Sequence, residues 1–472
     1  MIRLALPTGD LRKPLAAALA SAGIDIPGYG EGSRSYRFQA GTSDEVAIRV
    51  FRERDIPVQI ALGNYDVGIC GAADVEDYLW RFPQGSVTRV GELGVGRRTL
   101  YAAAAAHAPS QTVAPPAGGR APLRIASEYG NIAEAFAIGL RLPAYRVLPV
   151  WGSAHAYPPE DADVAIVSAS GPDVLAGWGL RPLATLLEGG AALIANRDGI
   201  ATKDLSPLLT PLTSALRSVG ESGLRLPRRV EGLPAPRGRP DVVRLAVPDG
   251  HQQPDAVAAL QDAGIELDGY DLSRADIRPS SGVDGLEVKV IRPQDMAQQV
   301  ALGSFDLAIT GRDWLFDHKI RFPSSPARQL VDLGRCRYTL VATMSEDESA
   351  SSLGEALRQW RSGGRQTIRV ASEYMAIADH YAQGWRLGRY QVIPIAGASE
   401  GFVPEDAEIL IEGTETGSTL AANRLKIVER LFESTSRVIG HAEVPRGQRG
   451  ELVEKLITQF QRAAVPAGAG GR

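Results

Sequence analysis

A chain of 472 residues is long enough for several domains with well-formed hydrophobic cores. Its formal net charge of -4 at pH 7 provides no basic surface of the kind that holds nucleic acid, so small anions are the better candidates for ligands. The two cysteines, Cys70 and Cys336, form neither a disulfide framework nor a metal-binding pattern, and we expect both to be packing residues in a reducing compartment.

The N-terminus enters an apolar strand directly at residues 2–7, without the charged and apolar regions of a secretory signal. No apolar stretch approaches the ~18 residues that a membrane-spanning helix needs. These two features predict a soluble cytoplasmic protein with no membrane partner.

The sequence repeats itself once. LALP at residues 4–7 returns as LAVP at 245–248, RFP at 81–83 returns at 321–323, and ASEY at 126–129 returns at 371–374. The matches stay collinear, so they indicate a duplication. A period this long predicts two folding units and not a stacked solenoid.

We therefore expect copy one at residues 1–227 and copy two at 242–464. Residues 228–241 are rich in Pro, Gly and Arg and predict a linker between the copies. Residues 465–472 predict a flexible tail.

Apolar runs and helical periodicity alternate along copy one. The predicted strands are 2–7, 46–51, 66–71, 123–127, 145–151, 164–167 and 191–196, and the predicted helices are 11–22, 56–62, 132–140 and a short one after residue 167. This alternation favours parallel α/β sheets with ligands at the carboxyl ends of the strands. The runs 99–106 and 191–196 are expected to cross between two lobes. Copy two adds an amphipathic helix at 352–362, where the matching stretch 108–122 holds four prolines.

One loop in copy two has the features of a phosphate cradle. Residues 412–420 follow a buried strand at 409–411 and precede an expected helix at 420–425. Small residues let backbone N–H groups and hydroxyls converge on one point, where a helix dipole also favours an anion. The alternative interpretation is a Gly/Thr/Ser-rich turn with a threonine cap.

Five segments of copy two form a collinear series: RPQDM at 292–296, DLAITGRD at 306–313, DLGRCR at 332–337, ASEY at 371–374 and TGSTL at 416–420. This series resembles the catalytic part of the ATP phosphoribosyltransferases of histidine biosynthesis. Copy one shares the resemblance more weakly, through DIP at 55–57, DVGICG at 66–71, SEY at 127–129 and LIANR at 193–197.

The resemblance implies two tandem copies of a two-lobed α/β fold like that of type II periplasmic-binding proteins. It also implies a Mg²⁺-dependent reaction of ATP with phosphoribosyl pyrophosphate (PRPP) that gives phosphoribosyl-ATP and pyrophosphate. Displacement at the sugar carbon requires aligned substrates and stabilised charge, with no protein nucleophile. We therefore assign no catalytic residue and no protein metal site.

The same resemblance gives candidate binding residues. Those expected to hold PRPP are Glu412, Thr414, Glu415, Thr416, Gly417, Ser418 and Thr419. The hydroxyls of Thr416, Ser418 and Thr419 would lie on the phosphate, and either Glu412 or Glu415 on the ribose hydroxyls. Those expected to meet nucleotide or pyrophosphate are Asp306, Gly311, Arg312, Arg335, Arg337 and Glu373. For each arginine the alternative is a surface ion pair, and for Asp306 it is a structural cap.

Three departures from the family pattern bear on activity. The first loops, Thr8-Gly9-Asp10 and Asp249-Gly250-His251, lack the lysine of the family. Copy one has Pro172 where its loop needs a backbone donor, so we expect its PRPP site to be degenerate. Copy two carries Glu412 in place of an aspartate.

The leading hypothesis is an ATP phosphoribosyltransferase of the short form, whose two fused copies mimic a homodimer and whose site lies on copy two. Its partners are ATP and PRPP, and a further homo-oligomer or a regulatory subunit is left open. The second hypothesis is a catalytically silent protein that binds a nucleotide or phosphometabolite. A third, an extracytoplasmic solute-binding protein, does not fit the N-terminus.

Overall fold

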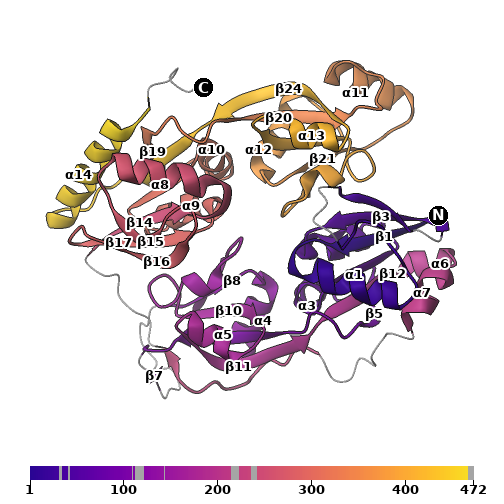
Figure 1. The fold of residues 1–472 in the computed structure, drawn as a ribbon, viewed down its shortest axis with the longest axis horizontal. Coiled ribbons are helices and arrows are strands. Elements are labelled where there is room, and N and C mark those ends of the chain that lie inside the picture. The colour runs from indigo at the N-terminus through magenta and orange to yellow at the C-terminus, as the bar shows by residue number, and fades with distance from the viewer. Residues whose placement is uncertain are drawn as a thin grey trace. The chain divides into compact units, whose positions relative to one another are not determined.

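The computed structural model describes residues 1–30, 35–40, 43–108, 110–111, 122–142, 144–213, 223–234 and 242–465 (Figure 1). Most of the proline-containing stretch 108–122, the second half of the expected linker and residues 466–472 of the expected tail lie outside these residues. The chain divides into two compact units, with the main boundary inside the expected linker, at residues 237 and 238.

Each unit includes a short segment of the other copy. The first unit comprises Met1–Val150, Tyr157–Arg237 and Ile395–Phe402, and the second comprises Trp151–Ala156, Gly238–Pro394 and Val403–Arg472. In the second unit the Trp151 N–H donates to the Asp295 carboxylate at 3.1–3.2 Å. In the first unit the Ala396 N–H donates to the matching carboxylate, Asp55, at 3.0 Å. Neither copy alone therefore contains a whole unit, a feature that the expected domain boundaries did not include.

The first unit has two lobes, each built on a mixed sheet. The sheet of the first lobe has the order β2-β3-β1-β4-β12-β5, with β3, β1 and β4 parallel and β12 antiparallel to β4 and β5. Its strands are β1 Ile2–Pro7, β2 Arg37–Ala40, β3 Ser43–Phe51, β4 Val67–Gly71, β5 Val87–Glu92 and β12 Ala191–Asn196. Its helices are α1 Arg12–Ser21, α2 Ile56–Ala61, α3 Ala72–Arg81, α6 Arg197–Thr202 and α7 Ser206–Thr213.

The second lobe of this unit has the order β11-β6-β10-β8-β9. Its strands are β6 Arg98–Ala105, β8 Leu123–Ser127, β9 Tyr145–Pro149, β10 Val164–Ala169 and β11 Leu180–Gly189, and its helices are α4 Gly130–Gly139 and α5 Pro172–Gly177. A small ladder joins β7 Ser110–Gln111 to β13 Leu233–Pro234. The chain crosses between lobes from β5 to β6 and returns from β11 to β12, as the apolar runs predicted.

The second unit repeats this plan. Its first lobe has the order β17-β14-β18-β25-β19. The strands are β14 Val243–Pro248, β17 Leu286–Ile291, β18 Leu307–Gly311, β19 Ala327–Asp332 and β25 Ser436–His441, with the hairpin β15 Leu267–Tyr270 and β16 Ala275–Ser281. The helices are α8 Gln253–Asp262, α9 Pro293–Ala301, α10 Arg312–Arg321 and α14 Gln448–Ala463, and α8 and α14 lie side by side (Figure 1).

The second lobe of this unit has the order β22-β21-β23-β20-β24. The strands are β20 Tyr338–Ser345, β21 Ile368–Ser372, β22 Tyr390–Pro394, β23 Ile409–Thr414 and β24 Leu425–Ser434. The helices are α11 Leu353–Ser362, α12 Met375–Gly384 and α13 Ser418–Ala422. Helix α11 is the predicted amphipathic helix, with Leu353, Leu357 and Trp360 buried. The helix expected at 420–425 instead begins at Ser418 and ends at Ala422, because Leu425 opens β24.

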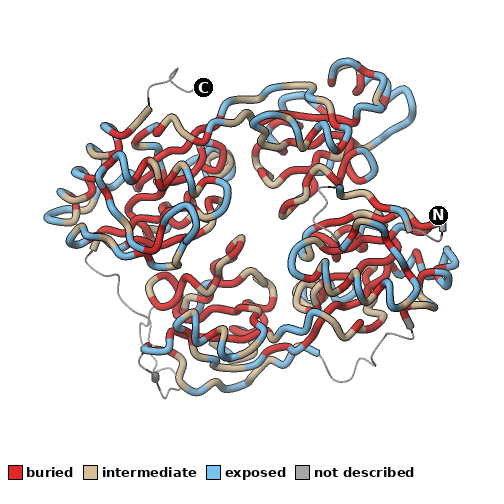
Figure 2. The backbone as a smooth tube through the Cα atoms, viewed as in Figure 1, coloured by how far each residue is buried: buried red, intermediate tan, exposed pale blue. Residues whose placement is uncertain are grey.

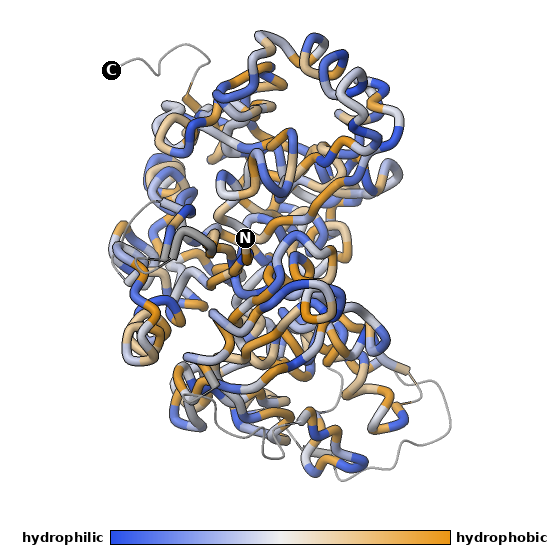
Figure 3. The backbone as a smooth tube through the Cα atoms, turned by 90° about the vertical axis from the view of Figure 1, so that its right-hand side faces the viewer, coloured by the Kyte–Doolittle hydropathy of each residue, from blue (hydrophilic) through white to orange (hydrophobic). Residues whose placement is uncertain are grey.

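Buried residues gather in the interior of each lobe, and the central strands of its main sheet carry much of the core (Figure 2). Hydrophobic stretches alternate with hydrophilic ones along the chain, as half-buried elements require (Figure 3). Within the part of the chain that the structure describes, no helix combines the length and the apolar character needed to cross a bilayer.

The lobes of each unit meet where two helices are joined by a carboxylate. Asp317 of α10 accepts the N–H groups of Ala376 and Ile377 at the start of α12, both at 2.9 Å. Asp77 of α3 accepts the N–H of Ile132 in α4 in the same way. A negative charge at a helix N-terminus is stabilising, so both units have the same junction between lobes.

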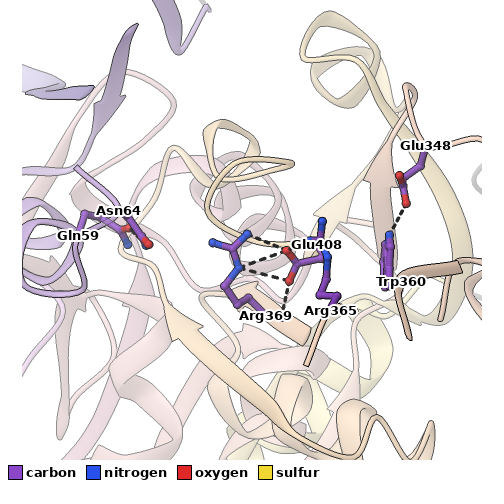
Figure 4. A network of polar contacts seen from close by, with 7 residues as sticks. All are labelled: Gln59, Asn64, Glu348, Trp360, Arg365, Arg369 and Glu408. Carbon is purple, nitrogen blue, oxygen red and sulfur yellow. Dashed lines mark hydrogen bonds and ion pairs between the residues drawn. The ribbon is translucent and has the colours of Figure 1, made fainter. Parts of the chain in front are cut away.

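Several charged pairs occupy matching positions in both copies and belong to the scaffold. In the second unit Arg369 and Arg365 both point at the buried carboxylate of Glu408, as Figure 4 shows. In the first unit Arg124 pairs with the buried Asp163 at 2.9 Å. The Arg–carboxylate pair thus recurs in both copies, at β21 in the second unit and at β8 in the first. It therefore supports the fold and does not mark a binding site of one copy.

Candidate functional site

The candidate loop lies at the end of β23, where the strand gives way to helix α13. Gly417 adopts the left-handed conformation with φ +76°, which only glycine reaches without strain. Its N–H donates to the Thr414 hydroxyl at 2.9 Å, and the Thr416 hydroxyl donates to that of Ser418 at 3.0 Å. The hydroxyls and the first N–H groups of α13 are therefore gathered on one side of a tight turn.

The Thr419 hydroxyl has no hydrogen-bond partner among the described residues, and Thr416 and Ser418 are exposed. Glu412 accepts the N–H of Gly413 at 2.9 Å, which holds its carboxylate beside the end of the strand. The loop thus presents hydroxyl donors to solvent with a carboxylate at its base. This is a donor set that suits a phosphate attached to a sugar.

His251 faces this loop from the first lobe. Its Nε2 lies 3.2 Å from Oε1 of Glu415, and its Nδ1 lies 3.9 Å from Sγ of Cys336. The first loop of copy two therefore brings a titratable base to the candidate site, although it lacks the family's lysine. Burial raises the pKa of the Cys336 thiol to about 12, so this cysteine is a packing residue and not a nucleophile at neutral pH.

The three candidate arginines take different directions. Arg337 pairs with the Glu433 carboxylate at 2.8 Å, and Arg312 donates to the Glu433 carbonyl at 3.0 Å and stacks on the Phe432 ring. Glu433 and Thr414 both face Thr339 of β20, so these two arginines lie at the same end of the sheet as the loop. Arg335 instead pairs with Asp262 at the end of α8, which turns it away from the loop.

Asp306 has structural partners on both carboxylate oxygens. It accepts the backbone N–H of Arg244 at 2.9 Å and pairs with Arg449 of α14 at 2.7 Å, and it is buried. In copy one, Asp66 accepts the N–H of Arg3 and pairs with Lys203 in the same way. Because both copies share this arrangement, it favours the interpretation of Asp306 as a structural cap over a role in ligand binding.

Gly311 and Glu373 are the two remaining candidates. A Cβ placed on Gly311 would lie 2.1 Å from the Asp313 carboxylate, so the glycine makes room for that side chain. Glu373 is half-buried and follows β21, at the carboxyl end of a parallel strand. Glu373 therefore lies at the edge of the sheet where ligands bind in open α/β folds.

The corresponding loop of copy one is built differently. Pro172 opens α5, so it supplies no N–H where Gly417 donates to Thr414 in copy two. Gly171 is extended, with φ 178°, and does not form the left-handed turn. These features agree with the expectation that copy one has no working phosphate loop.

In copy one, two acidic side chains meet beside Gly71, at the end of β4. A Cβ on Gly71 would lie 2.8 Å from Oε2 of Glu53 and 2.9 Å from Oδ2 of Asp74, so the two carboxylates converge beside it. Copy two has Pro293 and Trp314 at the matching positions. The other charged neighbours of Asp74 are Arg54, Asp77 and Glu128. Those of Glu53 are Arg98 and Asp10. Two converging carboxylates disfavour an anionic ligand in copy one.

Replacing Asp74 with asparagine is expected to stabilise the first unit at pH 7. Burial, followed for Asp74 by the charge of Glu53, raises the pKa of both carboxyl groups above the values of an unfolded chain. The folded unit therefore binds protons more tightly, and its stability falls as pH rises from the unfolded pKa through the folded pKa. Urea unfolding between pH 4 and 8 should show a flatter pH dependence for Asp74→Asn than for wild type. An unchanged pH profile would contradict the repulsion.

The sequence analysis missed three residues beside the loop: Asp313, Tyr338 and Ser434. Asp313 Oδ2 accepts the Tyr338 hydroxyl and Oδ1 accepts the Ser434 hydroxyl, each at 2.7 Å. The matching positions of copy one hold Ala73, Arg98 and Gly189. The signal that would have found them is the difference between the two copies at these three positions.

The family model and the curated relatives agree on one family. The family model described as "HisG: ATP phosphoribosyltransferase" matches residues 52–218 and again 292–462. A Deinococcus radiodurans protein named ATP phosphoribosyltransferase is 30% identical over 236 residues, which cover 49% of this chain and 96% of that protein. The protein of the same name from Chlorobaculum parvum is 26% identical over 238 residues, covering 49% and 74%.

Among solved structures, the ATP phosphoribosyl transferase (HisG:HisZ) complex from Thermotoga maritima matches 47% of this chain and 99% of its own, with 18% identity and a TM-score of 0.37. The alkanesulfonate-binding protein SsuA from Xanthomonas axonopodis pv. citri matches 48% of this chain and 74% of its own, with 9% identity and a TM-score of 0.30.

Proposed function

The chain belongs to the ATP phosphoribosyltransferase family as a tandem duplication, and we propose that it transfers the phosphoribosyl group of PRPP to ATP at one site, on copy two. The observation that carries the proposal is the loop from Glu412 to Thr419. Its left-handed glycine, its gathered hydroxyls and its helix N-terminus form a phosphate cradle that copy one lacks.

In this proposal the loop binds the 5-phosphate of PRPP. The hydroxyls of Thr416, Ser418 and Thr419 donate to the phosphate oxygens, and hydrogen bonds to a charged group are stronger than neutral ones. Glu412, at the base of the loop, accepts the ribose hydroxyls. The sugar is thereby held with its reactive carbon directed out of the loop, in the geometry that displacement by ATP requires.

Pyrophosphate leaves with added negative charge, and two arginines at the same end of the sheet as the loop would stabilise it. Arg337 and Arg312 lie at the same end of the sheet, and guanidinium groups bind phosphates in a two-pronged geometry. His251 lies against Glu415 and adds a proton donor when it is protonated. The reaction then needs no covalent intermediate with the protein.

We also propose that Mg²⁺ enters with the pyrophosphate group of PRPP. Among the described residues no group of three or more His, Cys, Asp and Glu side chains is placed to hold a metal ion. The proposal follows from the chemistry of Mg²⁺, which keeps several waters and binds through substrate phosphates with few protein ligands. Bound in this way, the ion neutralises charge on the leaving group.

The direct test is an assay of the purified chain with Mg²⁺, ATP and PRPP. We expect pyrophosphate release that requires both substrates, together with a product whose mass is that of phosphoribosyl-ATP. Omission of ATP or of PRPP is the control for hydrolysis. Binding of PRPP without any release of pyrophosphate would contradict the transferase and support a silent binding protein.

A further inference from the structure

Asp313 is the centre of a buried polar network at the junction of the two lobes in the second unit. It is the second residue of α10 and has no exposed surface. Its carboxylate accepts the Tyr338 and Ser434 hydroxyls at 2.7 Å, and the Tyr374 hydroxyl joins the same network. Burial, with the charge of Asp313, raises the pKa of both Tyr338 and Tyr374, so both hydroxyls stay protonated and remain donors.

The network joins elements of both lobes. Asp313 follows β18 of the first lobe, whereas Tyr338 opens β20 and Ser434 ends β24 in the second. Tyr374 stacks on Trp314, the residue after Asp313, with ring centroids 4.2 Å apart. A buried carboxylate is strongly destabilising when it is unpaired, so all these donors are held in place together.

Tyr338 connects this network to the phosphate loop. A Cβ placed on Gly413 would lie 2.9 Å from Cε2 and 3.0 Å from Cδ2 of the Tyr338 ring, so the ring packs directly on the Gly413 backbone. Gly413 pairs with Leu340 in the β20–β23 ladder, and the next residue along the chain, Thr414, accepts the N–H of Gly417. The hydroxyl end of Tyr338 is thus fixed by the first lobe, while its ring supports the base of the loop.

Copy one has lost this arrangement together with its loop. Ala73, Arg98 and Gly189 replace Asp313, Tyr338 and Ser434, and only Tyr129 is retained, in place of Tyr374. The side chain of Arg98 is half exposed and pairs with Asp10. The scaffold pairs described above recur in both copies, so this network is not required by the fold itself.

We propose that Asp313 is a positioning residue, which acts through Tyr338 to hold the Glu412–Thr419 loop in its phosphate-binding conformation. This inference rests on the proposed function, because the loop is taken to bind PRPP. It adds that the first lobe controls the conformation of a loop that belongs to the second.

The test compares Asp313→Asn, Tyr338→Phe and Ser434→Ala with wild type. Tyr338→Phe removes one oxygen and keeps the ring on Gly413, so it should preserve the fold even if Asp313→Asn does not. We expect the KM for PRPP to rise about tenfold in Tyr338→Phe, with a change in kcat of less than about threefold. Amide hydrogen exchange across residues 414–420 should become faster in the same variant.

The matched control is Asp332→Asn. Asp332 is also an acidic residue at the lobe junction, but its partners are the Thr435 hydroxyl, which it accepts at 2.9 Å, and Arg437, instead of Tyr338. Its substitution should leave both the KM for PRPP and the exchange of residues 414–420 unchanged within about twofold.

The outcomes separate this inference from the function on which it rests. Unchanged exchange of residues 414–420 in Tyr338→Phe would overturn the positioning role, whatever the activity. Equally fast exchange of residues 414–420 in Asp332→Asn would also overturn the positioning role. Any loosening of the lobe junction would then be sufficient to free the loop. Faster exchange in Tyr338→Phe alone, in a protein that releases no pyrophosphate, would support the positioning role and refute the proposed transferase.

Discussion

Replacing Thr416 and Thr419 together with alanine is expected to lower kcat/KM for PRPP by roughly 10²- to 10⁴-fold. Each hydroxyl is proposed to donate to a phosphate oxygen, and a hydrogen bond to a charged group contributes about 1.5–3 kcal/mol. Loss of two such bonds therefore costs about 3–6 kcal/mol of transition-state stabilisation. Thr416 is exposed, and Thr419 is half-buried in the short helix α13, so the unfolding transition should move little. Steady-state assays at several PRPP concentrations measure the effect.

The duplication provides a matched control for this experiment. Ser168 and Ser170 lie in the corresponding loop of copy one, which lacks the glycine turn. The Ser168→Ala, Ser170→Ala variant should keep kcat/KM within about twofold of wild type. Comparable losses in the two variants would show that both copies take part, and the assignment of one site to copy two would be wrong.

Replacing Asp306 with alanine is expected to lower the free energy of unfolding of the second unit by about 3–5 kcal/mol. The substitution leaves Arg449, which is mostly buried, without its carboxylate and leaves the Arg244 N–H without its acceptor. Asp66→Ala in copy one should cost less, because the side chain of Lys203 is 43% exposed and water can hydrate its freed ammonium. Urea unfolding followed separately for the two units measures both effects.

The same variants decide the role of Asp306. If Asp306 supports the fold, the folded Asp306→Ala protein should retain the KM for ATP of the wild type at low temperature. If the Asp306→Ala protein has unchanged stability and its KM for ATP rises at least tenfold, the structural role is contradicted and Asp306 is a ligand-binding residue.

The sequence predicted the elements of the fold where the periodicity was strong. The apolar runs at 66–71 and 191–196 are β4 and β12, and the fold class is confirmed, with sheets that mix parallel and antiparallel strands. The limits of α13 were not predictable, because the apolar Leu425 continues a helical pattern in the sequence, whereas in the fold it begins the edge strand β24. The exchange of Trp151–Ala156 and Ile395–Phe402 depends on contacts between residues far apart in the sequence, which no local pattern reveals.

The sequence suggested which residues belong to the candidate site, but it did not show which partners their side chains contact. The motif at 332–337 suggests Arg335 as a ligand residue, but it does not show that the side chain turns toward Asp262. The ASEY segment at 371–374 likewise does not show that Tyr374 is a core aromatic, which is buried and stacks on Trp314. Asp313 and Ser434 are 121 positions apart, and only the folded chain brings their oxygens into contact.

The measurement that tests the central claim most directly is calorimetric titration of PRPP with Mg²⁺ into the wild-type chain and into the Thr416→Ala, Thr419→Ala variant. The account predicts one site per chain in the wild type and none in the variant, with further heat of reaction when ATP is added to the wild type. Two sites per chain, or undiminished binding in the variant, would contradict a single PRPP site on copy two.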